Sequence, residues 1–200
     1  MSVVRSPRSR TTSLGAATAE RIADAAVTVV ARDGFDVLSV RTVAREAGVS
    51  GGTVQHHYDT RNALLLAAFA HTVDAITSRL IHSDLAGAVQ EVVTRLCEQA
   101  LPLDDERRRE CIVWTALSAA ASTHPELAHW QRRAVTLFTA TLASIIRDAR
   151  TAGELPQSCD PDVAAAVLVA VVDGLTLHGV AHQDQNSTAI LWAAITALLE

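Results

Sequence analysis

The chain has 200 residues, of which 49% are hydrophobic, and a formal net charge of −5 at pH 7. This length is enough for one large or two small domains. The longest uninterrupted apolar run, residues 163–172, is too short to span a bilayer, and residues 1–15 lack the apolar region of a secretory signal. We therefore expect a cytoplasmic protein with no membrane partner. Its three cysteines, Cys97, Cys111 and Cys159, are too widely spaced to predict a disulfide framework or a metal ribbon.

Charge is divided unevenly along the chain. Residues 1–61 hold eight arginines and six acids, a net of +2, whereas residues 62–200 hold nine arginines and sixteen acids, a net of −7. These values add up to the net charge of −5 of the whole chain. A basic N-terminal third on an acidic remainder is expected when one end of a protein meets a polyanion.

Two helices are predicted before residue 48. Apolar residues recur at helical spacing from Ile22 to Val30, and Gly34 ends this pattern. Ser39 is placed to cap a second, shorter helix, and Gly48 lies just beyond its C-terminus. The apolar side of this second helix carries Val40, Val43, Ala44 and Ala47.

A turn and a two-turn helix are predicted over residues 48–58. Ser50 can cap this helix by accepting a hydrogen bond from a backbone N–H two or three residues later. Helical spacing turns Val54 and Tyr58 toward a core and leaves a polar, uncharged face outward. That outward face carries Thr53, Gln55 and His56. Two short helices joined by a glycine turn predict a helix-turn-helix, and the outward face suits base edges and phosphates.

The stretch from Thr18 to Phe69 resembles the TetR-like (TetR/AcrR) transcriptional regulators. The matching segments are Ala31-Arg32-Asp33-Gly34-Phe35, the run from Ser39 to Ser50, and the run from Gly52 to Leu65. The resemblance implies an all-α fold with an N-terminal DNA-binding domain of three helices over residues 18–62. It also implies a C-terminal helical bundle over residues 63–200 for ligand binding and dimerisation.

The DNA-binding residues are predicted from the resemblance together with their places on the helices. Arg41 lies in the first turn of the second helix, and Arg61 opens the fourth helix, where the dipole and free N–H groups favour a phosphate. The family often has aromatic residues where Gln55 and His56 stand, and usually Lys where Arg61 stands, so the operator need not resemble that of a relative. The full set is Arg41, Thr42, Ser50, Gly52, Thr53, Gln55, His56, His57, Tyr58 and Arg61.

The first seventeen residues are rich in Arg, Ser and Thr, and we expect residues 1–17 to be a disordered basic arm. Such an arm either reaches DNA phosphates or a minor groove, or is a plain unordered leader. The sequence leaves both interpretations open.

Beyond Arg61 the apolar spacing stays helical to the end, with no strand alternation, so the body is predicted to be all-α. Residues 163–172 are apolar on every side, which indicates burial on more than one face. The last helix offers a stripe of Ile190, Leu191, Ala194, Ile195 and Leu198. The resemblance implies that these two helices pair with their twins in a homodimer, which would read a palindromic operator in double-stranded DNA.

The resemblance also implies a pocket for an unknown small-molecule effector between the fourth and eighth helices. The predicted lining is Phe69, Trp114, Trp130, Phe138 and His178, with His71, Thr115 and Gln131 as further polar groups. An aromatic residue at helical spacing is, however, more often plain core than the wall of a pocket. No cofactor is implied.

The sequence thus predicts a ligand-responsive repressor that a small molecule releases from its operator, and not an enzyme. Gly48-Val49-Ser50-Gly51-Gly52 matches the nucleophile elbow of hydrolases, but a helical pattern precedes it where that motif needs a strand. Two alternatives stay open. One is a metal sensor using His178 and His182, with His124 and His129 as further ligands, and the other is an all-α adaptor that binds proteins.

Overall fold

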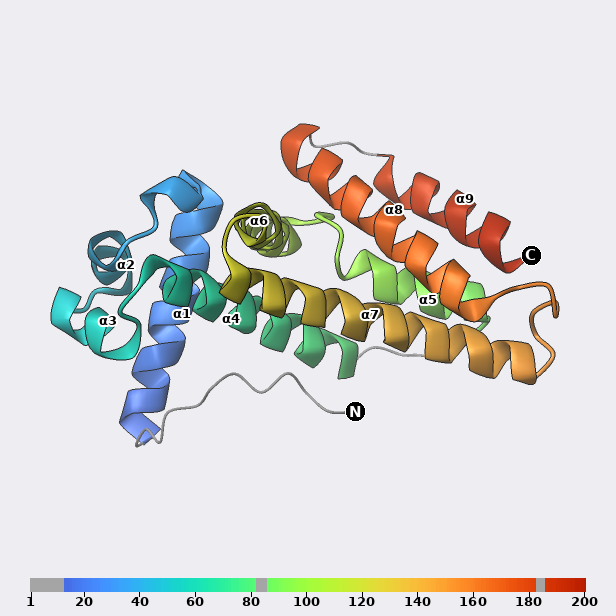
Figure 1. Cartoon of the computed structure of the whole chain (residues 1–200), viewed down its shortest axis with the longest axis horizontal. Helices are drawn as coiled ribbons and strands as arrows, with labels where there is room; N and C mark the ends of the chain where they lie inside the picture. Colours follow the sequence, from blue (N-terminus) through green and yellow to red (C-terminus); the bar gives the residue numbers. More distant parts are fainter. Residues whose placement is uncertain (1–12, 82–85, 183–185) are drawn as a thin grey trace.

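The computed structural model describes residues 13–81, 86–182 and 186–200, and within these ranges the regular structure is entirely helical (Figure 1). This confirms the all-α prediction. The N-terminal elements are α1 (Ser13–Asp33), the 3-10 helix η1 (Phe35–Val37), α2 (Val40–Ala47) and α3 (Gly51–His57). The remaining elements are α4 (Arg61–Ile81), α5 (Val89–Glu98), α6 (Asp105–Ala121), α7 (Pro125–Thr151), α8 (Pro161–His182) and α9 (Ser187–Leu199).

The start of α1 corrects the predicted extent of the basic arm. Residues 13–17, which the composition placed in the arm, belong to α1. Ala16 and Ala17 are strong helix formers, so the helix begins before the apolar pattern that starts at Ile22. The rest of the predicted arm, residues 1–12, lies outside the described residues.

The N-terminal end of the molecule is organised around one small core. Ile22 of α1, Val43 of α2, Val54 of α3 and Leu64 of α4 are fully buried in it. Figure 1 shows α2 and α3 at the tip of the molecule, with α1 and α4 behind them. Helix α3 is therefore held from the inside by Val54, and its other side faces solvent.

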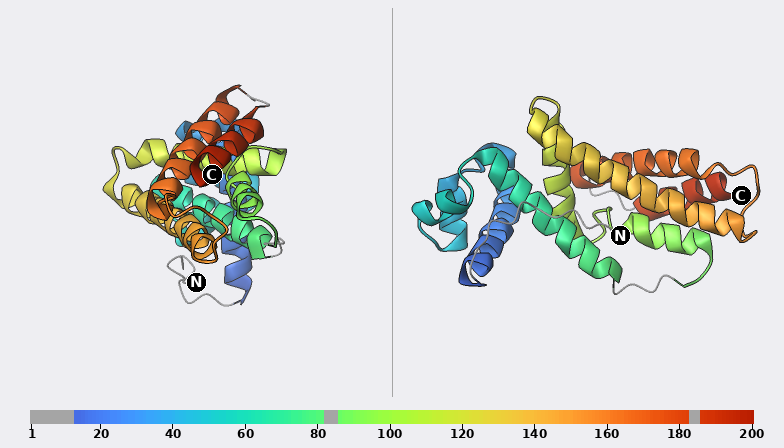
Figure 2. Two further views of the ribbon diagram at one scale, coloured as in Figure 1. Left: turned by 90° about the vertical axis from the view of Figure 1, so that its right-hand side faces the viewer. Right: turned by 60° about the horizontal axis from the view of Figure 1, so that its bottom comes forward.

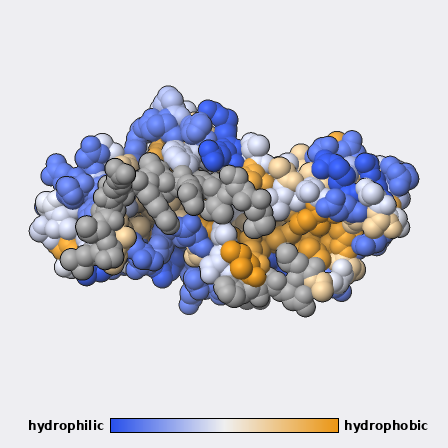
Figure 3. Space-filling view, turned by 90° about the horizontal axis from the view of Figure 1, so that it is seen from below, coloured by the Kyte–Doolittle hydropathy of each residue, from blue (hydrophilic) through white to orange (hydrophobic). Residues whose placement is uncertain are grey.

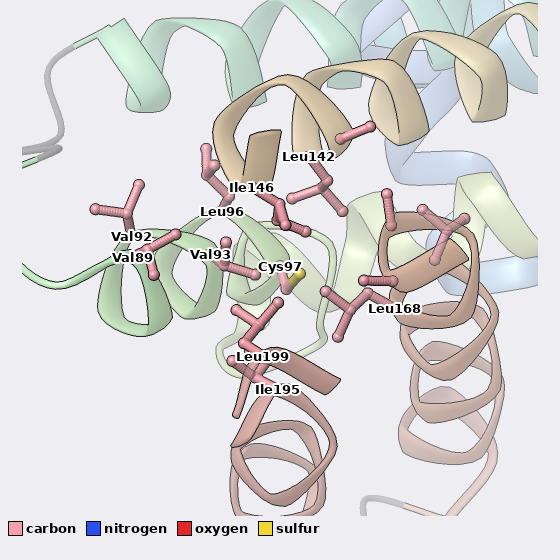
Figure 4. Packing of buried hydrophobic residues seen from close by; sticks show 14 of the residues in the cluster. Val89, Val92, Val93, Leu96, Cys97, Leu142, Ile146, Leu168, Ile195 and Leu199 are labelled. Atoms are coloured by element: carbon pink, nitrogen blue, oxygen red, sulfur yellow. The ribbon is translucent and has the colours of Figure 1, made fainter. Parts of the chain in front are cut away.

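A second core fills the C-terminal half, with residues from α5, α7, α8 and α9 packed together (Figure 4). Its labelled members are Val89, Val92, Val93, Leu96, Cys97, Leu142, Ile146, Leu168, Ile195 and Leu199. Helix α6 lies between the two halves in Figure 1 and in the right-hand view of Figure 2, and it supplies Val113 and Leu117 to the N-terminal core. The two halves are thus joined through α6 and through α4.

Length and composition alone would allow two helices, α4 and α8, to cross a membrane. In the fold, 33% of the most apolar window of α4 and 44% of that of α8 are buried. Buried core helices have this composition because both sides of them pack against neighbours. Seen from below, hydrophobic surface gathers in the half of the molecule away from α2 and α3 (Figure 3).

The close approach of α8 to the segment before α6 gives a test of the packing. A methyl group added at Gly179 would lie 2.6 Å from Cγ of Pro102, which is closer than real Cβ contacts. We expect Gly179→Ala to lower the free energy of unfolding by about 1–3 kcal/mol, because the overpacked helix must shift. Urea unfolding followed by circular dichroism measures this change.

The matched control is the double variant Pro102→Ala, Gly179→Ala, which removes the ring atoms that the new methyl group meets. It should recover part of the loss, because the two substitutions share one contact. Equal stability of the single variant and the wild type would show that α8 and Pro102 are not packed this closely.

Candidate functional site

Helix α2 is started by a reciprocal pair of hydrogen bonds. The Ser39 hydroxyl accepts a bond from the Thr42 backbone N–H at 3.2 Å, and the Thr42 hydroxyl oxygen accepts one from the Ser39 backbone N–H at 3.0 Å. Thr42 also donates its hydroxyl to the Val37 carbonyl at 2.8 Å. The predicted cap at Ser39 is confirmed, and the Thr42 side chain is occupied in fixing the start of α2.

Helix α3 is capped as the sequence predicted. Ser50 Oγ accepts a bond from the Thr53 backbone N–H at 3.0 Å and lies 2.8 Å from Thr53 Oγ1. Gly48 takes the left-handed conformation, with φ 64°, that ends α2 and starts the turn. A glycine is favoured there because a side chain makes this conformation costly.

The outward face of α3 carries the groups that are free to meet a partner. Gln55 and His56 are exposed, whereas His57 and Tyr58 are partly buried. Burial raises the pKa of the Tyr58 hydroxyl, and this ring packs against the N-terminal core. Of these four predicted contact residues, two therefore face outward and two lie at the edge of the core.

Two arginines on α2 add positive charge beside this face. Arg41 in the first turn and Arg45 one turn later are both exposed. The neighbouring Glu46 is bound by Arg32 of α1 at 2.9 Å, which draws that acid toward α1. A surface with exposed arginines and hydrogen-bonding side chains is suited to a polyanion whose bases are also read.

Arg61 has partners inside the chain that the sequence did not reveal. Its Nε donates to the Phe35 carbonyl at 3.1 Å, and its Nη2 donates to the same carbonyl and to Asp36 Oδ1. The guanidinium carbon also lies 4.0 Å from the centre of the Phe35 ring. Arg61 therefore fastens the start of α4 to η1, while its side chain stays 39% exposed, so the phosphate contact stays a prediction.

The predicted effector residues are only partly brought together. Phe69 of α4 and Trp114 of α6 lie with ring centres 5.8 Å apart. Trp130 instead meets the ring of His129, Phe138 packs against the C-terminal core, and His178 is exposed on α8. The spacing did not reveal these different environments because each depends on which neighbouring helix a face meets.

The further polar candidates also have local roles. Thr115 donates its hydroxyl to the Cys111 carbonyl one turn earlier, and His71 Nε2 lies 3.8 Å from Asp24 Oδ1 of α1. Gln131 is partly buried on α7. A residue that the sequence reasoning missed is Asp173 of α8, whose Oδ1 accepts a hydrogen bond from Trp114 Nε1 at 3.1 Å. A lone acid inside an apolar helix was the available signal.

The residues that the structure describes contain no group of three His, Cys, Asp or Glu side chains able to hold a metal ion. The metal-sensor alternative therefore gains no support. Ser50 follows helix α2 and its hydroxyl is engaged with Thr53, so the strand-borne geometry of a hydrolase nucleophile is missing at this residue. Burial raises the pKa of Cys97 and Cys111 to about 12, which suits inert core thiols.

Comparison with known proteins gives two matches to family models, which cover separate parts of the chain. Residues 22–68 match the model described as bacterial regulatory proteins, tetR family. Residues 89–200, more than half of the chain, match the model described as BetI-type transcriptional repressor, C-terminal. The chain belongs to the TetR family. It is a ligand-responsive, DNA-binding transcriptional repressor and not an enzyme.

Several relatives of this TetR-family protein are similar over most of their length. The regulator PksA of Bacillus subtilis is 28% identical over 160 residues, which are 80% of this chain and 77% of PksA. The regulator BetI of Serratia proteamaculans is 28% identical over 192 residues, 88% of this chain and 90% of BetI. A transcriptional regulator from Rhodococcus superposes with a TM-score of 0.81 at 30% identity, covering 90% of this chain and 95% of the other.

The contacts of Arg61 predict a structural role that is measurable without DNA. We expect Arg61→Ala to lower the free energy of unfolding by about 1–2 kcal/mol, because hydrogen bonds to the Phe35 carbonyl and the contact with its ring are lost. Thermal or urea unfolding of the free protein measures this effect.

Arg61→Lys is the matched variant, since it keeps the charge over the Phe35 ring and loses the paired donors. An intermediate loss of stability is expected for it. If Arg61→Ala left the stability of the free protein unchanged and lowered only the affinity for DNA, the guanidinium would act on a phosphate instead.

Proposed function

We propose that this TetR-family regulator binds a palindromic operator as a homodimer, with one α3 in the major groove of each half-site. The observation that carries the proposal is the outward face of α3, which is polar, exposed and held rigidly by the Ser50 cap and the buried Val54. Such a helix is too short to specify a long sequence alone. Two copies related by a two-fold axis would read half-sites about one helical turn apart or more.

The exposed side chains of α2 and α3 would make the direct contacts with DNA. Gln55 and His56 would contact base edges, because they are exposed and both donate and accept hydrogen bonds. Arg41 would bind a phosphate. A methyl group added at Gly52 would meet only Ser50 Oγ, at 3.8 Å, so this side of the glycine is open. Gly52 would therefore allow the backbone of α3 to come close to the duplex.

The other predicted contacts would act through position. The hydroxyl groups of Thr42, Ser50 and Thr53 are hydrogen-bonded at the starts of α2 and α3. These residues would therefore meet the phosphates through their backbone rather than through their side chains. His57 and Tyr58 border the core and would support the end of α3. Residues 1–12 remain a candidate arm.

The homodimer would form through α8 and α9. Several large apolar side chains of these two helices are exposed, including Val163 at 57% and Leu177 at 53%. Val167 on α8 and Ile190 and Trp192 on α9 are also exposed. The stripe expected on α9 is split, because Leu191 and Ile195 point into the core of their own chain. An exposed apolar surface of this kind is typical of an interface with another copy.

Helix α4 would carry the effector signal to the DNA-binding end. Its first residues are tied to η1 through Arg61 and to α7 through a 2.6 Å hydrogen bond from Asn62 Nδ2 to Glu126 Oε1. Its last turn is tied to α6, where Arg79 donates to both carboxylate oxygens of the buried Glu110. An effector that fits one arrangement of α4, α6 and α7 better would move α4 and change the spacing of the two readers.

A related structure supports a small-molecule site in this fold. A transcriptional regulator from Saccharomonospora viridis, determined in complex with choline, superposes with a TM-score of 0.76 at 23% identity and covers 91% of this chain and 95% of the other. For this chain we place the effector between α4, α6 and α8, where Phe69 meets Trp114. We assign the protein to the cytoplasm, because its partner is genomic DNA.

The division of contacts predicts different effects of two substitutions on α2 and α3. Gln55→Ala should alter the preferred base at its position in each half-site, because a base-edge contact is worth about 1–3 kcal/mol of discrimination. Arg41→Ala should instead weaken binding to all sequences and reduce the salt slope by about one phosphate. Fluorescence anisotropy on operator fragments selected from the DNA beside the gene, at several salt concentrations, measures both.

Arg133→Ala on α7 is the matched control, because this exposed arginine lies outside the DNA-binding domain. It should leave base preference and salt slope unchanged. Binding that is unaffected by both test variants, in protein that stays folded, would overturn the contact assignment.

The proposed interface is tested by placing a charge in it. Leu177→Arg should shift the protein from dimer to monomer and weaken operator binding by at least tenfold, because each α3 would then bind alone. Sedimentation velocity measures the first effect. Leu103→Arg, at an apolar residue before α6 that is 37% exposed, is the control that should stay dimeric. A dimeric Leu177→Arg variant with full affinity would exclude this face.

A further inference from the structure

Three consecutive arginines at residues 107–109 lie in the first turns of α6, directly after three acids at residues 104–106. Each arginine stands three residues after an acid, a spacing that is typical of ion pairs on an exposed helix surface. The structure keeps this arrangement at the first arginine, since Arg107 Nε donates to Asp104 Oδ2 at 2.8 Å. The next two arginines instead bind α8 and α1.

Arg108 binds the C-terminal end of α8. Its Nη1 donates to the Gly179 carbonyl at 3.0 Å, and its Nη2 donates to the Val180 carbonyl at 2.8 Å. Both carbonyls are among the last four of α8, which have no N–H partner within the helix, and the helix dipole favours a cation at this end. The Thr176 hydroxyl adds a 2.7 Å bond to the Ala100 carbonyl before α6. The start of α6 is therefore bonded to the end of α8 through several groups.

Arg109, the next residue on α6, binds α1 of the DNA-binding domain. Its Nη2 donates to Thr28 Oγ1 at 2.9 Å and lies 3.8 Å from Asp24 Oδ1, one helical turn earlier on α1. The same carboxylate oxygen lies 3.8 Å from Nε2 of His71 on α4. Because consecutive residues of a helix point about 100° apart, one turn of α6 can hold α8 with one arginine and α1 with the next.

The two helices held by these arginines belong to different parts of the molecule. Helix α1 supplies Ile22 and Ala26 to the N-terminal core, whereas α8 supplies Leu168 and Leu175 to the C-terminal core. Helix α8 also carries the exposed Leu177 of the proposed dimer interface, close to the carbonyls that Arg108 binds. Figure 1 shows α6 between α1 and α8. The start of α6 therefore connects the DNA-binding domain to a helix of the proposed interface.

We propose that Arg108 and Arg109 are positioning residues, which set the angle of each DNA-binding domain against the dimer interface and thereby the separation of the two α3 helices. A bivalent protein binds an operator tightly only when this separation matches the spacing of the half-sites. Arg109 is 44% exposed, so its ion pair is weak alone, but both copies in a dimer contribute. This inference rests on the proposed homodimer through α8 and α9.

The experiment compares operators whose half-sites are moved apart in single base-pair steps, with an isolated half-site as the reference. Fluorescence anisotropy on the full-length wild type should show one preferred spacing. Arg109→Ala should lose about threefold or more in affinity at that spacing, and the double variant Arg108→Ala, Arg109→Ala about tenfold. Affinity for the other spacings should fall less, so the preference becomes flatter. Binding to the isolated half-site should not change, because the exposed groups of α3 are unaltered.

Arg107→Ala is the matched control, because it removes the same charge from the same turn of α6. Its partners, Asp104 and the Glu98 carbonyl, lie at the start of α6 and the end of α5, so it should keep the wild-type spacing preference. Arg109→Lys keeps a positive charge near Asp24 and should retain part of the preference. An equal flattening in Arg107→Ala, or an unchanged preference in folded Arg109→Ala, would overturn the proposal.

The wild-type result separates this inference from the proposal on which it rests. A wild type that binds isolated and paired half-sites with equal affinity would refute the homodimeric recognition of a palindrome, and this inference with it. A wild type with one preferred spacing that Arg109→Ala shares unchanged would refute the positioning role alone. If the double variant fails to fold, Arg109→Ala decides the question, because this arginine is exposed and its removal leaves the bonds of Arg108 to α8 in place.

Discussion

The proposed DNA-binding face of α3 depends on one constraint, the burial of Val54 on the inner side of this seven-residue helix. A helix this short is not stable alone in water, because its few hydrogen bonds do not offset the free energy cost of nucleation. Its shape is maintained by the Ser50 cap at one end, the left-handed Gly48 before it and the side chain of Val54 below. The outward groups Gln55 and His56 are consequently presented on a fixed support.

The same logic connects the reading helix to the rest of the molecule through α4. Leu64 and Leu65 bury the first half of this helix in the N-terminal core, and Arg79 fastens its last turn to Glu110 of α6. A buried carboxylate such as Glu110 is costly without its cation, so the two helices are strongly coupled there. An element that is bound at both ends to different partners transmits a displacement of one end to the other.

Two buried or partly buried carboxylates in the C-terminal half differ in their partners. Glu110 forms an ion pair with Arg79 of the same chain, and its role is therefore structural. Asp173 accepts a hydrogen bond from a neutral donor, the Trp114 ring N–H, and the Ser118 hydroxyl on α6 is buried without a hydrogen-bond partner among the described residues.

Local features of the sequence determined the helices, their caps and the family. Ser39, Gly48 and Ser50 act within a few residues of themselves, so their roles were predictable from spacing and confirmed by the hydrogen bonds. Tertiary structure alone decided the partners of Arg61 and Trp114, which lie 26 and 59 residues away along the chain. It also decided which side of α9 faces its own core, because an apolar helix has no polar face to mark the outside. Spacing along one helix specifies a face, but the neighbour that this face meets is set by the packing of the whole chain.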